Sequence, residues 1–463
     1  MAEEKSLKDE QFREESLNGN LWKLLIKVGT PLAFYQMLTS FYNIVDSLIA
    51  SHINADAVST VAYLSEISAL AQAIGMGLAL GGSVTLAKAY GAGEYKKVSR
   101  YSATLVVISL IAMAAVLCLL PFTGLILRLG GTSPEMIRTG STYFAIQLSS
   151  VAVAFFNDIY IAIEKARGNT RRIFAINMVV IVIKLGLTAF FVYGLHSGVT
   201  MIAVASLIAQ LLLMTFGVIM LTHDDSAFRF RMKNIRLKKD TVMPMIGLGT
   251  PVAIEHTVFA AGKVAVNFMC SKFGTMTVGA LGISNKYSGV MNGLGSGFKD
   301  GGTSVISQNM GAGNYKRALE AWKKELLICF GIGIFGTVVL TSLLGPVSHL
   351  FASSSEGYNA EFEDVIRRVA IFEAIGAPIP ICVAHACSSM IFSLGKTKEM
   401  LVLNMIRLFV LRIFALWALQ TFTNLGVECA GIVMVISNAG YAVILLFTTL
   451  FEIRKLKREK GIA

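Results

Sequence analysis

Charged residues are scarce in this sequence. Only 15% of its 463 residues are Asp, Glu, Lys or Arg, whereas 54% are hydrophobic and the mean hydropathy is +0.65. Soluble proteins carry about 25% charged residues. This shortage excludes an ordinary soluble globular protein and predicts an integral membrane protein.

Several chemical motifs are also missing. The chain has no Gly-x-x-x-x-Gly-Lys-Ser/Thr loop, so we expect no direct use of ATP. It has no Asp-rich cluster of the kind a membrane prenyltransferase uses to hold magnesium, and no enzyme activity is expected. The six cysteines include no C-x-x-C pair, so we expect neither disulfides nor a metal site. The first 23 residues are charged and lack an apolar core, which argues against a cleaved targeting segment.

Apolar windows long enough to cross a membrane recur along the chain. A crossing needs about 20 apolar residues. The predicted spans are 24–50, 57–87, 101–122, 139–163, 174–194, 199–221, 243–270, 277–308, 326–350, 366–394, 401–420 and 427–452. We therefore predict an all-α integral membrane protein with twelve transmembrane helices.

The chain contains one long pattern twice. Residues 81–97 match residues 301–317 at an offset of 220 positions, and the same offset carries Gly29 onto Gly249 and Gly77 onto Gly297. Repeats of six spans enter the membrane from the same side, so we predict two pseudo-symmetric six-helix bundles related by an axis along the membrane normal. The predicted parts are an amino-terminal segment (1–23), a first bundle (24–221), a basic linker (222–242), a second bundle (243–452) and a basic tail (453–463).

The basic residues lie mostly on one side of the predicted spans. The net charge is +12, and about 30 of the 41 Lys and Arg fall on the side that holds both termini, as cytoplasmic loops do. This placement indicates a topology signal on solvated loops rather than a nucleic-acid surface. We expect a multi-pass protein of the cytoplasmic membrane with both termini in the cytoplasm, membrane lipids around it and no nucleic-acid partner.

Short motifs in both halves resemble those of a known family. They are Pro31 and Val45-Asp46-Ser47 in the first span, Gly91-Ala92-Gly93 after the second, the Gly-x-Thr turn at Gly168, and the second-half copies at Pro251, Gly311-Ala312-Gly313 and Gly395. On these residues the chain is similar, from about residue 20 to 455, to the multidrug and toxic compound extrusion (MATE) family. The resemblance implies a monomer with a central cavity, and antiport of small amphipathic compounds by alternating access. It implies no cofactor beyond a coupling ion, sodium or a proton.

Ionisable residues within membrane spans are costly and usually mark pathways or relays. Asp46 lies near the outer end of the first span, and Tyr35, Tyr42 and Asn43 fall near its helical face. The resemblance implies that the aspartate of the Val-Asp motif serves the coupling ion. The alternative is a carboxylate that is simply hydrated at the outer interface.

Glu255 is the second candidate for ion coupling. It lies about twelve residues into its span, too deep to reach water by extending its side chain. Some members of the resembled family carry an acid on the seventh helix one turn later, where this chain has Phe259. We interpret Glu255 as a cation- or proton-binding residue.

Lys184 departs from the resembled family. It aligns where that family often has an asparagine of the ion site, and it lies about 15 Å from either end of its span. Our hypothesis is that Lys184 pairs with Asp46, its ammonium replacing a bound cation. The alternative is a lysine held permanently by a carboxylate for packing alone.

Three further lysines lie in spans, namely Lys263, Lys286 and Lys299. Counter-charges are available from Glu66, Asp158, Asp300 and Glu373. Neighbours such as Lys299 and Asp300 point about 100° apart on a helix and need not pair. Lysines that line the cavity would favour anionic or zwitterionic compounds over cations.

The residues assigned to the substrate cavity combine these groups with nearby polar side chains. They are Tyr35, Gln36, Tyr42, Asn43, Asn157, Asp158, Lys263, Lys299 and Asp300. For Gln36 and Asn157, hydrogen bonding between helices is the commoner role of such residues. In the eleventh predicted span, Arg407 lies near enough to the membrane surface to extend to it, whereas Arg412 needs a partner.

These observations favour a secondary transporter that exports small amphipathic compounds or drugs. Alternatives of the same class are an exporter of anionic or zwitterionic metabolites and a lipid-linked saccharide flippase. A membrane-embedded enzyme would need a reactive cluster at one depth, and the sequence shows none. A scaffold or receptor without transport would not explain charged residues within the membrane spans of both halves. Both alternatives are therefore less favoured.

Overall fold

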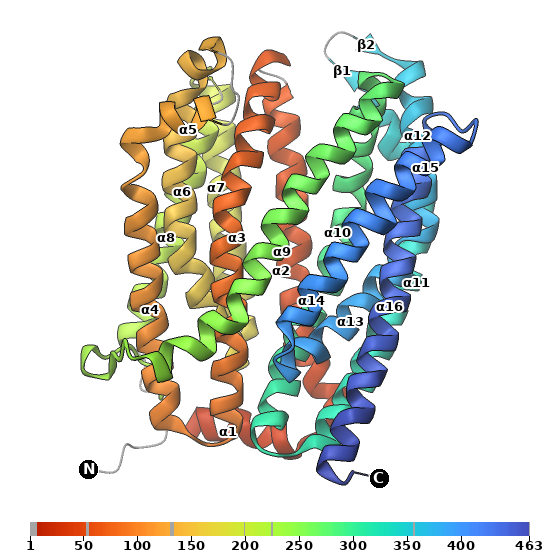
Figure 1. The fold of residues 1–463 in the computed structure, drawn as a ribbon. Helices are drawn as coiled ribbons and strands as arrows, with labels where there is room; N and C mark the ends of the chain where they lie inside the picture. The colour runs from red at the N-terminus through yellow and green to blue at the C-terminus, as the bar shows by residue number, and fades with distance from the viewer. Residues whose placement is uncertain are drawn as a thin grey trace. The chain divides into compact units, whose positions relative to one another are not determined.

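The computed structural model describes residues 7–51, 55–129, 134–198, 200–223, 226–354 and 357–462. Figure 1 labels the α-helices and the β-strands. In chain order, the elements are α1 (Leu7–Asn18), α2 (Leu21–Ser51), α3 (Ala55–Gly91), α4 (Tyr95–Leu117), η1 (Leu120–Phe122), α5 (Thr123–Leu129), α6 (Pro134–Ala166), α7 (Thr170–Ala189), η2 (Phe190–Gly194), α8 (Thr200–His223), η3 (Met232–Asn234), α9 (Lys239–Cys270), η4 (Ser271–Phe273), α10 (Thr275–Gly311), α11 (Tyr315–Ala352), β1 (Ser353–Ser354), β2 (Gly357–Tyr358), α12 (Ala360–Gly376), α13 (Pro378–Leu394), α14 (Thr397–Met405), η5 (Ile406–Phe414), α15 (Ala415–Phe422) and α16 (Glu428–Lys460). Among these, η2 and η5 are π-helices, and β1 and β2 form a short antiparallel hairpin.

Helices account for every predicted span, and the prediction of an all-α membrane protein is confirmed. In the described residues, nine helical segments are long and apolar enough to cross a membrane, and α12 and α13 pass together as a tenth. The other two predicted spans are α2 and α10, helices of 31 and 37 residues. The predicted span 366–394 was wrong in one respect, because it bends by 47° where Pro378 begins α13. Proline suits the first position of a helix and cannot continue the helix before it.

The chain folds into two compact units. Unit 1 contains residues 1–19, 41–257 and 307–313, and unit 2 contains residues 20–40, 258–306 and 314–463. In unit 1, α6 packs against α3, α4 and α8, and its Phe144 and Phe155 lie in an apolar core (Figure 1). In unit 2, α11, α12, α13 and α16 pack together, and the core includes Val433 of α16.

Glycine contacts explain why α2 and α9 each run through both units. In unit 1, a Cβ on Gly77 of α3 would lie 2.5 Å from the carbonyl oxygen of Gly249 at the beginning of α9. In unit 2, the repeat mate Gly297 of α10 contacts the backbone at Ala33 of α2 so closely that a Cβ would overlap it. Small residues let helices approach this closely in a membrane. The beginning of α9 therefore packs in unit 1, and the beginning of α2 packs in unit 2.

The duplicated motif marks a further crossing, where α3 and α10 end within unit 1. A Cβ on Gly91 would overlap the carbonyl oxygen of Gln308, and a Cβ on Gly311 would overlap that of Lys88. Both pairs are related by the offset of 220 positions, so the crossing is symmetric. The pattern that defines the repeat is thus also a contact between its two copies.

Helix α1 covers this crossing from the amino terminus. The Nε of Arg13 donates to the carbonyl oxygen of Gly91 at 3.0 Å, and Asn309 of α10 donates from Nδ2 to the carbonyl oxygen of Ser16 at 3.2 Å. The ring of Phe12 lies directly against Gly168 in the turn between α6 and α7. Helix α1 therefore joins the ends of three helices of unit 1.

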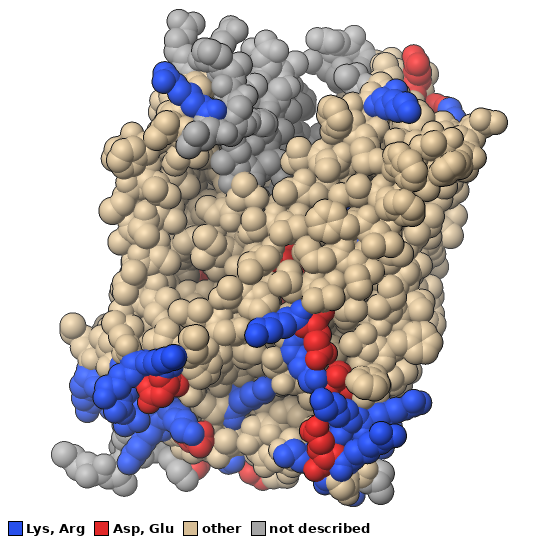
Figure 2. All heavy atoms as spheres, in the orientation of Figure 1, with Lys and Arg blue, Asp and Glu red and all other residues tan. Residues whose placement is uncertain are grey.

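Basic residues gather at one end of each unit (Figure 2). In unit 1 they surround the loop after α8, with Arg229, Arg231, Lys233, Lys238 and Lys239. In unit 2 they occupy the last turns of α16, with Arg454, Lys455, Lys457, Arg458 and Lys460. Each unit therefore has one strongly basic end, as loops on one side of a membrane require.

Candidate functional site

In unit 1, Lys184 of α7 lies against α2. Its side chain is buried, with 6% exposed, and its Nζ lies 4.2 Å from the centroid of the Tyr42 ring. This is a cation–π contact. Position 46 is four residues after Tyr42, so it lies one turn further along α2 and on the same helical face as Tyr42. The side chains of Asn43, Asp46 and Glu66 lie outside the described residues, so the pairing of Lys184 with Asp46 stays a prediction.

The polar residues of α6 are engaged in contacts between helices of unit 1. Asp158 accepts a hydrogen bond at Oδ2 from Nε2 of Gln72 on α3, at 2.8 Å. Asn157 donates from Nδ2 to both the carbonyl oxygen and the side-chain oxygen of Gln210 on α8, at 2.9 and 2.6 Å. These bonds fit the interhelical role considered for Asn157. Glu255, the other acid predicted to couple ions, is half-buried on α9.

In unit 2, the predicted cavity residues are more scattered. Tyr35 and Gln36 are half-buried on α2, and Lys263 is exposed on α9. Lys299 and Asp300 of α10 form an ion pair of 3.8 Å, a pairing that the sequence analysis did not require. The lysine stem is long enough to fold back across the 100° between adjacent positions.

A π-helix brings two arginines of unit 2 onto one face. Arg407 and Arg412 lie five positions apart in η5, and a π-helix repeats at i to i+5. Both guanidinium carbons lie 5.1 Å from the centroid of the Phe259 ring on α9. Phe259 is the position where some members of the resembled family have an acid. Here an aromatic face, rather than a carboxylate, meets the positive charge.

Hydrogen bonds fix these two arginines from α16. The Oδ1 of Asn438 accepts from Nη2 of Arg407 at 2.6 Å, and the Oγ of Ser437 accepts from Nε of Arg412 at 3.2 Å. Arg412 is 4% exposed, so the prediction that it needs partners is confirmed. The buried carboxylate of Glu373 on α12 interacts electrostatically with both guanidinium groups.

Sequence reasoning missed Glu325 of α11. Its side chain is fully buried in unit 2, where Oε2 accepts a hydrogen bond of 2.6 Å from Oγ of Ser389 on α13. The prediction began this span at residue 326 and so left Glu325 in a loop. The offset of 220 positions could have found it, since it pairs Glu325 with Leu105 inside the third predicted span.

Lys396 holds the turn between α13 and α14 in unit 2. It forms ion pairs with Glu399 at 2.9 Å and with Glu452 of α16 at 2.5 Å. Burial, the largest influence, lowers the pKa of Lys396, but the hydrogen bonds and charges of the two glutamates outweigh it and raise this pKa above its ordinary value. The preceding Gly395 has φ of 84°, a left-handed conformation that suits glycine in such a turn.

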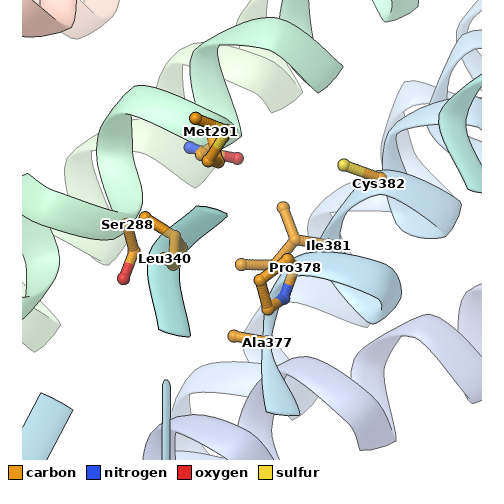
Figure 3. A pocket seen from close by; sticks show the side chains of 8 residues that line it. Ser288, Met291, Leu340, Ala377, Pro378, Ile381 and Cys382 are labelled. Carbon is orange, nitrogen blue, oxygen red and sulfur yellow. The ribbon is translucent and has the colours of Figure 1, made fainter. Parts of the chain in front are cut away.

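Unit 2 also contains a small cavity between α10, α11 and α13. Its volume is about 10 Å³, enough for at most one water. Ser288 and Met291 line it from α10, Leu340 from α11, and Pro378 and Ile381 from α13 (Figure 3). The cavity is too small for an organic substrate.

Comparisons with known proteins agree with this fold. The family model MatE matches residues 31–190 and 251–417. The chain is 22% identical to the multidrug export protein MepA of Staphylococcus haemolyticus, over 73% of this chain and 74% of that one. It is also 22% identical to the human multidrug and toxin extrusion protein 1, over 90% of this chain and 71% of that one.

Two solved structures share the fold over nearly their whole length. One is described as the outward-facing conformation of a multidrug resistance MATE family transporter, with a TM-score of 0.88, 19% identity, and coverage of 96% of this chain and 98% of that one. The other is a transporter of the MOP superfamily from Pyrococcus furiosus, described as having a binding pocket of reverse polarity that suggests a different function. It has a TM-score of 0.89, 19% identity, and coverage of 98% of this chain and all of that one.

Proposed function

Because this chain belongs to the MATE family of multidrug and toxin extrusion transporters, we propose that it is an antiporter that exports small organic compounds by alternating access. A sodium or proton gradient drives the cycle. The observation that supports this mechanism best is the buried ammonium of Lys184, held 4.2 Å from the Tyr42 ring on α2. A buried cation on α7, packed against the helix that bears Asp46, is costly in a membrane, and such residues usually mark transport pathways.

In this proposal Asp46, Lys184 and Glu255 couple the ion to transport. The ammonium of Lys184 stands where a cation would bind and exchanges with a proton or sodium ion at Asp46. An ion shifts a conformational equilibrium only by binding the two states unequally. Ion binding at Asp46 or Glu255 therefore favours the outward-facing state and weakens substrate binding there.

The proposed location is the cytoplasmic membrane, with both termini in the cytoplasm and the protein acting as a monomer. The basic ends of the two units support this orientation, since cytoplasmic loops are enriched in Lys and Arg. The last turns of α16, which precede the end of the chain, are one of these basic segments.

A second candidate function is export of anionic or zwitterionic metabolites. Lys184 is buried in unit 1, and in unit 2 two arginines lie around one ring with the buried carboxyl group of Glu373 nearby. Such an excess of positive charge favours anions. The Pyrococcus furiosus transporter, described as having a binding pocket of reverse polarity, gives a precedent for a change of pocket polarity within this fold.

The test is gradient-driven uptake of two matched fluorescent compounds, one cationic and one anionic, into inside-out vesicles. Lys184→Met is compared with the wild type, and Lys184→Arg is the control that keeps the charge. Uptake of the cation supports multidrug export, whereas uptake of the anion that Lys184→Met abolishes supports the second candidate. Unchanged uptake in Lys184→Met, and in Asp46→Asn combined with Glu255→Gln, would overturn the proposed coupling.

A further inference from the structure

Glu325 occupies a slot between three helices of unit 2. It projects from α11 onto Gly302 of α10, where an added Cβ would overlap its carboxyl group. Ser389 of α13 donates to Oε2 at 2.6 Å. The other oxygen, Oε1, is buried and has no hydrogen-bond partner among the described residues. A carboxyl group is thus enclosed with one donor for its two oxygens.

The repeat provides a direct comparison for this slot. In unit 1, Leu105 of α4 projects onto Gly82 of α3, where an added Cβ would lie 2.8 Å from Leu105 Cδ1. Gly82 and Leu105 correspond to Gly302 and Glu325 at the offset of 220 positions. Leu105 and Glu325 are both fully buried. A leucine therefore fills the same slot, so neither packing nor volume explains the presence of an acid.

The charged surroundings of Glu325 do not neutralise a carboxylate. On α10, Lys299 and Asp300 act on it from a distance and with opposite sign, and they pair with each other at 3.8 Å. The remaining titratable neighbours are the thiols of Cys329 on its own helix and Cys387 on α13. Within the described part of the chain, no cation forms an ion pair with Glu325. An enclosed carboxyl without such a partner is expected to be neutral.

We propose that Glu325 is a proton-binding site of the transport cycle, in addition to Asp46 and Glu255. Its carboxyl group holds a proton on Oε1 while α10, α11 and α13 are packed around it, and the proton passes to water when this packing opens. Ionisation and close packing of the three helices then exclude each other. Because the proton binds the packed state more tightly, its binding and release shift the conformational equilibrium. The inference rests on the proposed transport function.

Glu325→Gln and Glu325→Leu test the proposal in purified protein. Leucine is the residue at the corresponding position of unit 1, Leu105. We therefore expect both variants to remain folded, with melting temperatures at or above that of the wild type. The infrared carbonyl band of a protonated carboxylic acid should be weaker in Glu325→Gln than in the wild type. Proton release on binding of the fluorescent compound, cationic or anionic, that the wild type transports should fall by about one proton per transporter in both variants, when followed in weakly buffered solution.

The control is Glu320→Gln on the same helix. Glu320 is exposed and pairs with Lys324 at 2.5 Å, so its replacement should leave the infrared band and the proton count unchanged. A wild-type protein that releases protons, together with a Glu325→Gln variant that releases the same number, would overturn the role of Glu325 alone. A wild-type protein that releases none would overturn the role of Glu325 and proton coupling together.

Discussion

Each unit places a cation over an aromatic ring, but the two arrangements differ in chemistry. In unit 1 the ammonium of Lys184 lies over Tyr42, and in unit 2 the guanidinium groups of Arg407 and Arg412 lie over Phe259. In both cases the cation comes from the fifth predicted span of its half and the ring from the first. The same pair of predicted spans thus carries a compact charge in one unit and two planar groups in the other.

This difference indicates which of the two groups of cations changes its contacts during transport. A guanidinium is a rigid fork of donors, and here hydrogen bonds from Arg407 and Arg412 to α16 fix it. A lysine ammonium is a point charge on a flexible stem, whose protonation changes more readily on burial. We therefore interpret Arg407 and Arg412 as residues that stabilise the packing of unit 2. We interpret Lys184 as the group that exchanges with the coupling ion during transport.

Of the substitutions that test this comparison, Arg412→Met is expected to lower the free energy of unfolding most. Its loss leaves Glu373, Ser437 and Asn438 buried with fewer partners, and breaking such a network costs about 3–5 kcal/mol of the free energy of unfolding. Thermal unfolding in detergent measures it. Arg454→Met on the exposed end of α16 is the control and should unfold like the wild type. Equal melting temperatures for the two variants would contradict the structural role of Arg412.

An intermediate effect is expected from Phe259→Leu. The change removes the ring face from both guanidinium groups, and each cation–π contact is worth about 0.5–2 kcal/mol. The free energy of unfolding should fall by about 1–4 kcal/mol. A double-mutant cycle with Arg412→Met separates the ring contact from lost volume. Strict additivity of the two substitutions would show that the ring and the guanidinium do not interact.

The smallest effect on stability is expected at Tyr42. Tyr42→Leu should lower the free energy of unfolding by about 1 kcal/mol through the lost contact with Lys184, whereas Tyr42→Phe keeps the ring and should change it by less than about 0.5 kcal/mol. Gradient-driven uptake should nevertheless fall with Tyr42→Leu, because the ammonium is no longer positioned. A loss of stability as large as that of Arg412→Met would erase the distinction between the two units.

Apolar length and the glycine repeat were enough to predict the helices from the sequence. Windows of apolar residues predicted all the spans, because a membrane crossing constrains length and polarity strongly. Residue 325 escaped this reasoning for the same reason, since an acid at the edge of an apolar window looks like a loop. The bend at Pro378 was missed because each side of it is apolar. Its position depends on the packing of two shorter helices.

The candidate sites were harder to predict than the helices. The predicted depth of Arg412 in its span indicated that it needs partners. It did not indicate that a π-helix would place Arg412 on the same helical face as Arg407. The ion pair of Lys299 and Asp300 was missed because ideal helix geometry ignores the reach of a lysine stem. The assignment of residues 20–40 to unit 2 depends on glycine contacts such as Gly297 with Ala33, which become visible only in three dimensions.

The contacts of α1 have a practical consequence for handling this protein. Through Phe12, Arg13 and Ser16 the helix touches the turn after α6, the last residue of α3 and the last turns of α10. An affinity tag, fusion partner or protease site placed before residue 7 would strain or disrupt these contacts of α1. The carboxyl terminus, where α16 ends in exposed lysines, is the better attachment point for labels or for surface immobilisation.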